Sequence, residues 1–276
     1  SKGKPNPGLP LCYFKAGGCR AQIKNMRHNI AAIILAAGLG KRMHSPKAKV
    51  LHEVLGRPMV SYVVAAAGKI AGEAVVVVVG HQAQAVRDVV SQTAAARYAQ
   101  QAQQLGTGHA VTCALPLLPA GCEHVVVLCG DTPLLTAGTL ERLVADHVAA
   151  GRDATLVAVE LEQPTGYGRV LLNAERQVCG IVEEADATAD QRAIRLINSG
   201  IDCMRLEFLV EMLPRLSTDN AQREFYLTDL IRLGYESSRN IGVSPGADPD
   251  EILGVNTPQD LARVEALMAR RSSINT

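Results

Sequence analysis

Residues 74–80 read Ala-Val-Val-Val-Val-Val-Gly, a run of five valines between two small residues. β-Branched residues favour extended backbone, and a short apolar run that ends in glycine is typical of a strand. A strand with apolar side chains on both faces is stable only when both faces are covered. The run therefore predicts the interior of a sheet with helices packed on each side.

Segments of strand length and helix length alternate on both sides of this run. Residues 31–35 and 124–131 have the apolar character of further buried strands, while residues 58–70, 84–96 and 136–150 are long enough for helices. Such alternation is typical of βαβ units, whose strands are parallel. The predicted fold class is therefore α/β, with a doubly wound, mostly parallel sheet.

The second half of the sequence has a different pattern, with shorter apolar segments. We interpret it as a mixed or antiparallel extension of the same sheet, with strands over residues 154–161, 168–172, 178–184 and 198–204 and helical pieces near 207–216 and 226–236. A terminal helix is predicted from Thr257-Pro258, because these residue types favour the N-cap and the first helical position.

Three segments are expected along the chain. Residues 1–25 have no strand or helix period and are punctuated by Pro and Gly, so we interpret them as a flexible arm or an expression remnant. Residues 26–256 form the predicted main domain, and residues 257–276 the terminal helix and tail.

Composition limits the classes of function. The 276 residues are 47% hydrophobic with a formal net charge of +1, which allows a large core but not the basic face that a general nucleic-acid binder needs. No apolar stretch predicts a membrane span, and the N-terminus lacks a signal-peptide core. We therefore expect a cytoplasmic protein that binds neither nucleic acid nor membrane. The seven cysteines contain no C-x-x-C pair and are expected to be free thiols.

A glycine loop, "LAAGLGKRM" from Leu35 to Met43, follows the first predicted strand. Such loops bind phosphate through backbone amides, although glycine also serves a plain strand-to-helix turn that needs positive φ. The loop is not a Walker A motif, because Arg42 stands where Ser or Thr is required, and Met43 replaces the third glycine of a dinucleotide fingerprint. Because Arg42 and Lys49 add two cations, we predict a triphosphate site.

Asp131 follows the strand "HVVVLC" at the end where open α/β sheets bind their ligands. A carboxylate in this place commonly holds Mg²⁺ together with substrate phosphates. The alternative is that Asp131 only caps the turn before Thr132-Pro133.

A polar turn lies between the second and third buried strands, in the sequence "QAQQLGTGHA" from Gln101 to Ala110. Glutamine amides can pair with the acceptor and donor groups on the edge of a uracil base. The alternative is a hydrated loop in which Thr107 is a helix N-cap.

The order of these segments is more informative than any one of them. "LAAGLGKRM", "QLGTGHA", "CGDTPLL", "TGYGRV" and "EFYLTD" together resemble the uridyltransferase domain of the bacterial bifunctional GlmU family over about residues 30–270. The resemblance implies a Rossmann-like fold of the sugar nucleotidyltransferase type. It also implies transfer of UMP from UTP to N-acetylglucosamine 1-phosphate with release of pyrophosphate, in the synthesis of cell-wall precursors.

The resemblance assigns roles to individual residues. It implies that Arg42 and Lys49 are catalytic and that Asp131 and Asn256 hold Mg²⁺. The implied contacts to uracil come from Gln101, Gln104, Gly106 and Thr107, and those to the N-acetylglucosamine moiety from Gly168, Glu183 and Asn198. Further substrate contacts are implied for Leu35, Ala36, Ala37, Gly38, Cys129, Gly130 and Asn256.

The sequence departs from the family pattern at three points. Ala48 replaces a proline before Lys49, and Cys129 replaces a frequent tyrosine. The hexapeptide repeats of the family's β-helix are absent, so we expect neither acetyl transfer nor the trimer that the β-helix builds. Two alternatives stay open: a sugar nucleotidyltransferase of other base or sugar specificity, and a catalytically silent regulatory protein that binds nucleotide sugars.

Overall fold

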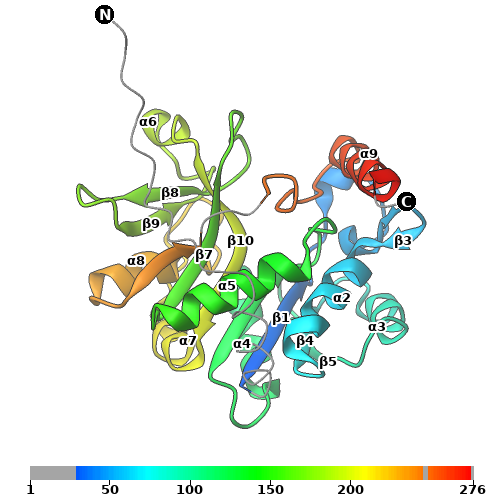
Figure 1. Cartoon of the computed structure of the whole chain (residues 1–276), viewed down its shortest axis with the longest axis horizontal. Coiled ribbons are helices and arrows are strands. Elements are labelled where there is room, and N and C mark those ends of the chain that lie inside the picture. The colour runs from blue at the N-terminus through cyan, green and yellow to red at the C-terminus, as the bar shows by residue number, and fades with distance from the viewer. Residues whose placement is uncertain (1–28, 245–247, 275–276) are drawn as a thin grey trace, which may run out of the picture.

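The computed structural model describes residues 29–244 and 248–274, so the predicted arm, residues 1–25, lies outside the described residues. Figure 1 shows a twisted central sheet with helices on both faces. Seven strands form its main path in the order β11-β7-β10-β6-β1-β4-β5. Their bounds are β1 Ile30–Ala36, β4 Val75–Val79, β5 Arg97–Gln100, β6 His124–Cys129, β7 Ala154–Glu160, β10 Leu196–Arg205 and β11 Ile241–Ser244.

Strand direction divides the sheet into two parts. β1 is parallel to both β4 and β6, and β5 is parallel to β4. β10 is antiparallel to β6 and β7, while β11 is parallel to β7. An antiparallel pair, β8 (Arg169–Leu172) and β9 (Val178–Val182), joins the sheet through β10. The predicted parallel sheet with a mixed extension is confirmed.

The valine strand β4 is covered on both faces. All five of its valines are fully buried. Val75, Val77 and Val79 pack in a cluster with helices α2 (Met59–Ala71), α3 (Ala83–Ser91) and α5 (Ala137–Ala149). Val76 and Val78 pack in a second cluster, on the face of α4 (Thr107–Ala114), α7 (Leu206–Met212) and α8 (Asp229–Glu236). Each buried valine contributes about 1.5–3 kcal/mol, and the predicted cover on both sides is confirmed.

The register of the parallel strands brings their carboxyl ends to one edge. Leu35 lies opposite Cys129, and Val79 lies opposite both Ala36 and Gln100. The segments that follow β1, β4, β5 and β6 therefore leave the sheet side by side. A backbone hydrogen bond from Gly130 N to Leu35 O, 3.0 Å long, continues the pairing past the end of β6.

Short elements complete the described chain. The 3₁₀ turns η1 (Lys41–Met43) and η2 (Lys49–Leu51) follow β1, and β2 (Glu53–Val54) pairs with β3 (Arg57–Pro58). Three more are η3 (Leu115–Leu117), α6 (Ala189–Arg192) and η4 (Leu213–Arg215).

The terminal helix α9 (Pro258–Ile274) begins at the predicted proline. The Thr257 hydroxyl accepts a hydrogen bond from Asp260 N at 3.1 Å, and the Asp260 carboxylate accepts one from Thr257 N at 2.9 Å. This reciprocal pair caps the first turn. Val264 anchors the helix in a third apolar cluster that includes Val54 and Leu134.

The described cysteines and helices bear on two of the expectations from the sequence. Cys113, Cys122, Cys129, Cys179 and Cys203 are free thiols, as predicted for them. Among the described helices, none is both long enough and apolar enough to span a bilayer.

A buried histidine pair lies at the amino end of β6. His147 of α5 is fully buried, with Nδ1 2.9 Å from the Thr155 hydroxyl and Nε2 3.2 Å from Nδ1 of His124. Burial, followed by the charge of the neighbouring His124, lowers the pKa of His147 to about 3.

This histidine makes stability depend on pH. Below pH 6.5 the unfolded chain binds a proton at His147 that the folded chain excludes down to about pH 3, so the free energy of unfolding falls as the pH falls through that window. The slope reaches at most about 1.4 kcal/mol per pH unit for one group. We expect His147→Gln to flatten the slope measured by urea unfolding between pH 6.5 and 4.5. His44→Gln, which removes an exposed histidine, should keep it, and equal slopes for wild type and His147→Gln would contradict the assignment.

Candidate active site

A cleft of about 500 Å³ opens at the edge where the parallel strands end. Its walls are the glycine loop after β1, the turn after β5 and the end of β6. The predicted residues that line it are Leu35, Ala37, Gly38, Arg42, Lys49, Gln101, Gln104, Gly106, Thr107, Cys129, Asp131 and Asn256. The structure thus brings together residues from five separate segments of the chain.

Two cationic side chains and two side-chain oxygen groups meet in one corner of this cleft. Arg42 Nη2 donates to Asn256 Oδ1 at 2.8 Å, and Lys49 Nζ donates to the same oxygen at 3.1 Å. Lys49 also forms an ion pair with the Asp131 carboxylate. The Lys49 ammonium therefore lies where the side-chain oxygens of Asp131 and Asn256 converge.

Gly40 of the glycine loop occupies a position that only glycine fits without strain. Gly40 has a φ of +62°, and a Cβ at this position would lie 2.6 Å from Cβ of Lys49. Gly40 therefore permits both the left-handed turn and the close approach of the Lys49 segment. Gly38 has open space where a side chain would point, so its backbone is accessible from the cleft.

The turn after β5 holds Gln101 rigidly. Its side chain is buried, and Nε2 donates to Gly106 O at 3.0 Å and lies 3.1 Å from His109 Nδ1. With both amide hydrogens engaged inside the protein, Oε1 is the part of this side chain left for a ligand donor. Gln104 lies on the outer side, and a Cβ on Gly80 would be 2.8 Å from Gln104 Nε2.

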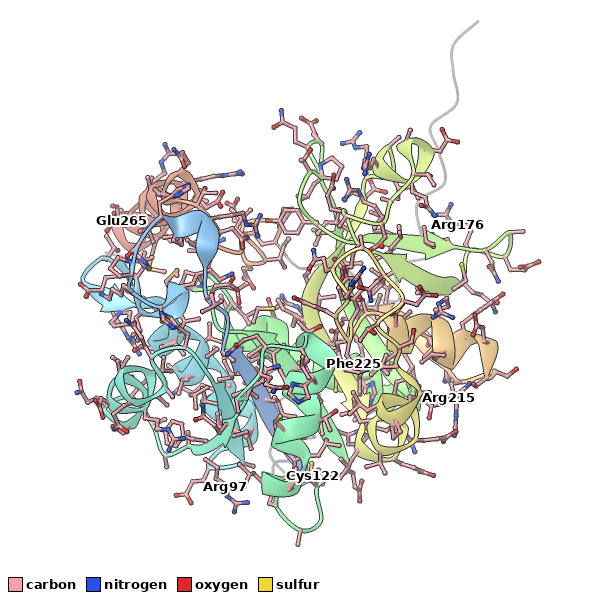
Figure 2. The ribbon with its side chains drawn as sticks, turned by 180° about the vertical axis from the view of Figure 1, so that it is seen from behind. Arg97, Cys122, Arg176, Arg215, Phe225 and Glu265 are labelled. Atoms are coloured by element: carbon pink, nitrogen blue, oxygen red, sulfur yellow. The ribbon has the colours of Figure 1, made fainter. Side chains whose placement is uncertain are left out.

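Thr107 is not a helix cap, unlike one reading of the sequence. The N-cap of α4 is Gly106, and the Thr107 hydroxyl instead accepts a hydrogen bond from Leu227 N at 2.9 Å. Phe225, labelled in Figure 2, lies against this turn. Its carbonyl oxygen would be 2.6 Å from a Cβ on Gly106 and accepts a hydrogen bond from Gly108 N at 2.8 Å. The "QLGTGHA" and "EFYLTD" segments are therefore packed backbone to backbone.

Gly168, Glu183 and Asn198 form a separate group outside the lining of the cleft. Asn198 N donates to Gly168 O at 2.8 Å, and a Cβ on Gly168 would be 3.4 Å from Glu183 Oε2. Thr228 donates to Glu183 Oε1 at 2.8 Å. Burial raises the pKa of Glu183, and this hydrogen bond opposes the shift.

Two predicted contacts are placed differently from the rest. Ala36 is buried in the core cluster beneath α2. Gly130 packs tightly against β1, since a Cβ there would be 3.1 Å from Leu35 O. Neither residue is part of the cleft lining.

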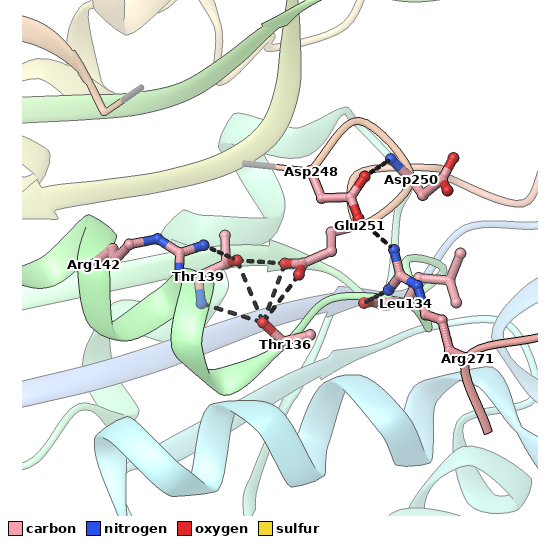
Figure 3. Close-up of polar contacts among 8 residues, drawn as sticks. All are labelled: Leu134, Thr136, Thr139, Arg142, Asp248, Asp250, Glu251 and Arg271. Atoms are coloured by element: carbon pink, nitrogen blue, oxygen red, sulfur yellow. Dashed lines mark hydrogen bonds and ion pairs between the residues drawn. The ribbon is translucent and has the colours of Figure 1, made fainter. Parts of the chain in front are cut away.

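A buried carboxylate holds the segment that carries Asn256. Figure 3 shows Glu251 at the first turn of α5, where the Thr136 hydroxyl lies 3.2 Å from each of its oxygens and Thr139 donates to Oε2. Arg142 in turn donates to the Thr139 hydroxyl at 2.8 Å. The positive end of the helix dipole favours a carboxylate in this position.

Two further contacts fix the same segment. Arg271 of α9 donates to Asp248 at 2.8 Å (Figure 3), and Val255 N donates to Asp131 O at 3.0 Å. Asn256 is thus positioned by α5, α9 and the loop after β6 together.

Comparison with known proteins identifies the family of this chain. The family model described as "MobA-like NTP transferase domain" matches residues 32–200. The chain belongs to this family. It is also 46% identical over 244 residues to the bifunctional protein GlmU of Trichlorobacter lovleyi. The aligned residues cover 88% of this chain and 53% of that protein.

Two other GlmU proteins are similarly related to this NTP transferase domain. Identity is 46% over 243 residues with the protein from Pelobacter propionicus, covering 88% of this chain and 53% of that one. It is 47% over 248 residues with the protein from Anaeromyxobacter dehalogenans, covering 89% and 50%. The chain spans about half the length of the curated relatives it matches.

Sequence reasoning missed five residues that line the cleft: Leu39, Gly40, Val50, Ala110 and Glu224. Leu39 and Gly40 lie in the glycine loop and Glu224 begins the "EFYLTD" segment, so motif membership could have identified them. Val50 and Ala110 carry no polar signal, and only the fold shows that they face the cleft.

We expect Glu251→Ala to loosen the Asn256 segment. The substitution leaves the Thr136 and Thr139 hydroxyls without their acceptor, which costs about 1–3 kcal/mol. Hydrogen exchange at the Val255 amide should accelerate more than tenfold, because its bond to Asp131 O is no longer held in place. Glu236→Ala, which breaks an exposed ion pair with Arg232, is the control and should change nothing there. Unchanged protection of Val255 in Glu251→Ala would refute the anchoring role.

Proposed function

We propose that this chain transfers UMP from UTP to N-acetylglucosamine 1-phosphate, forming UDP-N-acetylglucosamine and pyrophosphate. The observation that carries the proposal is the meeting of Arg42, Lys49, Asp131 and Asn256 in one corner of a cleft that also holds Gln101. Cations suit a triphosphate, and the acceptor oxygen of a buried glutamine suits the N–H group of a uracil base. Similarity to GlmU proteins supports the choice of nucleotide and sugar.

The proposed reaction requires the protein to position the two substrates and to neutralise phosphate charge. An oxygen of the sugar phosphate attacks the α-phosphorus of UTP in line, a new P–O bond forms, and the bond to the pyrophosphate leaving group breaks. No side-chain nucleophile is required. Arg42 and Lys49 bind phosphate oxygens and stabilise the negative charge that builds on the leaving group. Their present hydrogen bonds to Asn256 hold both cations at the cleft before substrate enters.

A divalent cation fits this corner. Asp131 and Asn256 offer a carboxylate and an amide oxygen, the hard ligands that Mg²⁺ prefers, and the Lys49 ammonium already occupies the point where these oxygens meet. Two protein ligands are enough for Mg²⁺, because it keeps waters and shares its shell with substrate phosphates. Bound there, Mg²⁺ would supply Lewis-acid neutralisation of phosphate charge.

The test is a panel of nucleotides and sugar phosphates, with pyrophosphate release as the readout. We expect turnover with UTP to exceed that with ATP by more than tenfold, because a wrong base leaves buried polar groups unpaired at about 1–3 kcal/mol each. Gln101→Ala should reduce this preference, while Gln103→Ala, an exposed neighbour outside the cleft lining, should preserve it.

Each alternative function has a distinct result in this panel. Equal use of UTP and ATP would replace the uridyl assignment with another base specificity, and faster turnover with another sugar phosphate would replace the sugar. Binding of UDP-N-acetylglucosamine without any turnover would identify a silent regulatory protein.

The metal assignment makes its own prediction. Asp131→Asn keeps the shape of the side chain but removes the only formal negative charge among the two proposed ligands. We expect kcat to fall by about two to four powers of ten, on the scale of a lost electrostatic stabiliser. Asn256→Ala should be milder and partly restored at high Mg²⁺, since water can replace a neutral ligand. Asp190→Asn, on exposed α6, is the matched control. Near-normal turnover of Asp131→Asn at low Mg²⁺ would place the metal elsewhere.

A further inference from the structure

Asp202 is a carboxyl group that the reaction described above does not use. It lies on β10, it is 4% exposed, and its Oδ1 is fully buried without a hydrogen-bond partner. Burying a polar atom without a partner costs about 1–3 kcal/mol, and an apolar side chain at this position would avoid that cost. An unpartnered buried group of this kind indicates a ligand or a mechanistic role.

The strand pairing places Asp202 beside Asn198, a member of the group formed with Gly168 and Glu183. Asp202 pairs with Leu156 and Asn198 with Ala158, so four residues of β10 advance against two of β7. Gly200, with a φ of +72°, forms the bulge between them. Leu156 and Ala158 pack in the same core cluster, so Asn198 and Asp202 share that face of the sheet. Oδ1 of Asn198 is also buried and unpartnered.

Charged and titratable neighbours connect this pair to the cleft. Cys129, which lines the cleft, has its Sγ 3.8 Å from Gly200 O, in the bulge. Burial raises the pKa of Asp202 to about 7, and the charge of Glu183 at the end of β9 adds to it. A negative charge on Glu183 disfavours a second negative charge on Asp202.

We propose that Asp202 is a further specificity residue of the sugar subsite, where it hydrogen-bonds the polar ring substituents of a sugar phosphate beside Asn198 and Glu183. This inference rests on the proposed function. The ligand class is a sugar phosphate with hydroxyl or amide groups on the ring, because these groups supply partners for the two orphaned oxygens. The protonated carboxyl is the binding form, since a bound sugar excludes water and favours the neutral group.

Steady-state kinetics of Asp202→Leu test the contact. The KM for N-acetylglucosamine 1-phosphate should rise about tenfold, equivalent to about 1.4 kcal/mol, while the KM for UTP changes less than twofold. The melting temperature of the substrate-free protein should rise, because an unpaired carboxyl is replaced by an apolar group. Asp153→Asn, at the residue before β7, where the carboxylate accepts a hydrogen bond from Asn240 N, is the control and should leave both KM values unchanged.

Asp202→Asn separates hydrogen bonding from titration. In the wild type we expect the KM for the sugar phosphate to rise between pH 6 and 8 as Asp202 loses its proton, and in Asp202→Asn this rise should be smaller. Titration of the sugar phosphate occurs in both proteins, so the difference reports Asp202 together with its charge interaction with Glu183.

The outcomes distinguish the two hypotheses. The proposed function is overturned if the wild-type protein shows no turnover with N-acetylglucosamine 1-phosphate and no binding of it by calorimetry. An active wild type whose sugar KM is unchanged in Asp202→Leu, or whose pH profile is unchanged in Asp202→Asn, overturns only the role of Asp202.

Discussion

The parallel pairing of β1 between β4 and β6 is the constraint on which the site depends. Because β1 and β4 are fully apolar and β6 nearly so, helices must cover both faces of these strands. Polar groups that bind a ligand are therefore placed at the strand ends. The register sets those ends level with one another. The glycine loop and Asp131 are therefore neighbours although about ninety residues separate them.

Much of this was accessible from the sequence because the signals were local. The valine run predicted covered strands, and Thr257-Pro258 predicted the start of a helix; both are confirmed. The glycine loop and Asp131 could be placed because both follow apolar strands, and parallel strands bring their ends together.

Other features could not be read from the sequence because they depend on distant contacts. Thr107 has the residue type of a cap, yet its hydroxyl is used by Leu227. Glu251 gives no local sign that it anchors a loop, since its partners lie more than a hundred residues earlier on α5. Asp202 lies four residues after Asn198, so strand alternation places both on one face. Only the structure shows that its Oδ1 is buried without a hydrogen-bond partner.

The backbone contact between the turn after β5 and the segment around Phe225 has a consequence for how specificity can change. Gly106 and Gly108 lie against Phe225, and three residues further along, Thr228 donates a hydrogen bond to Glu183. A larger residue in the first segment would displace the second, and with it the Thr228 hydroxyl that binds Glu183. The two segments therefore cannot be exchanged independently. Grafting the turn after β5 from a distant relative would require the "EFYLTD" segment to be transplanted with it.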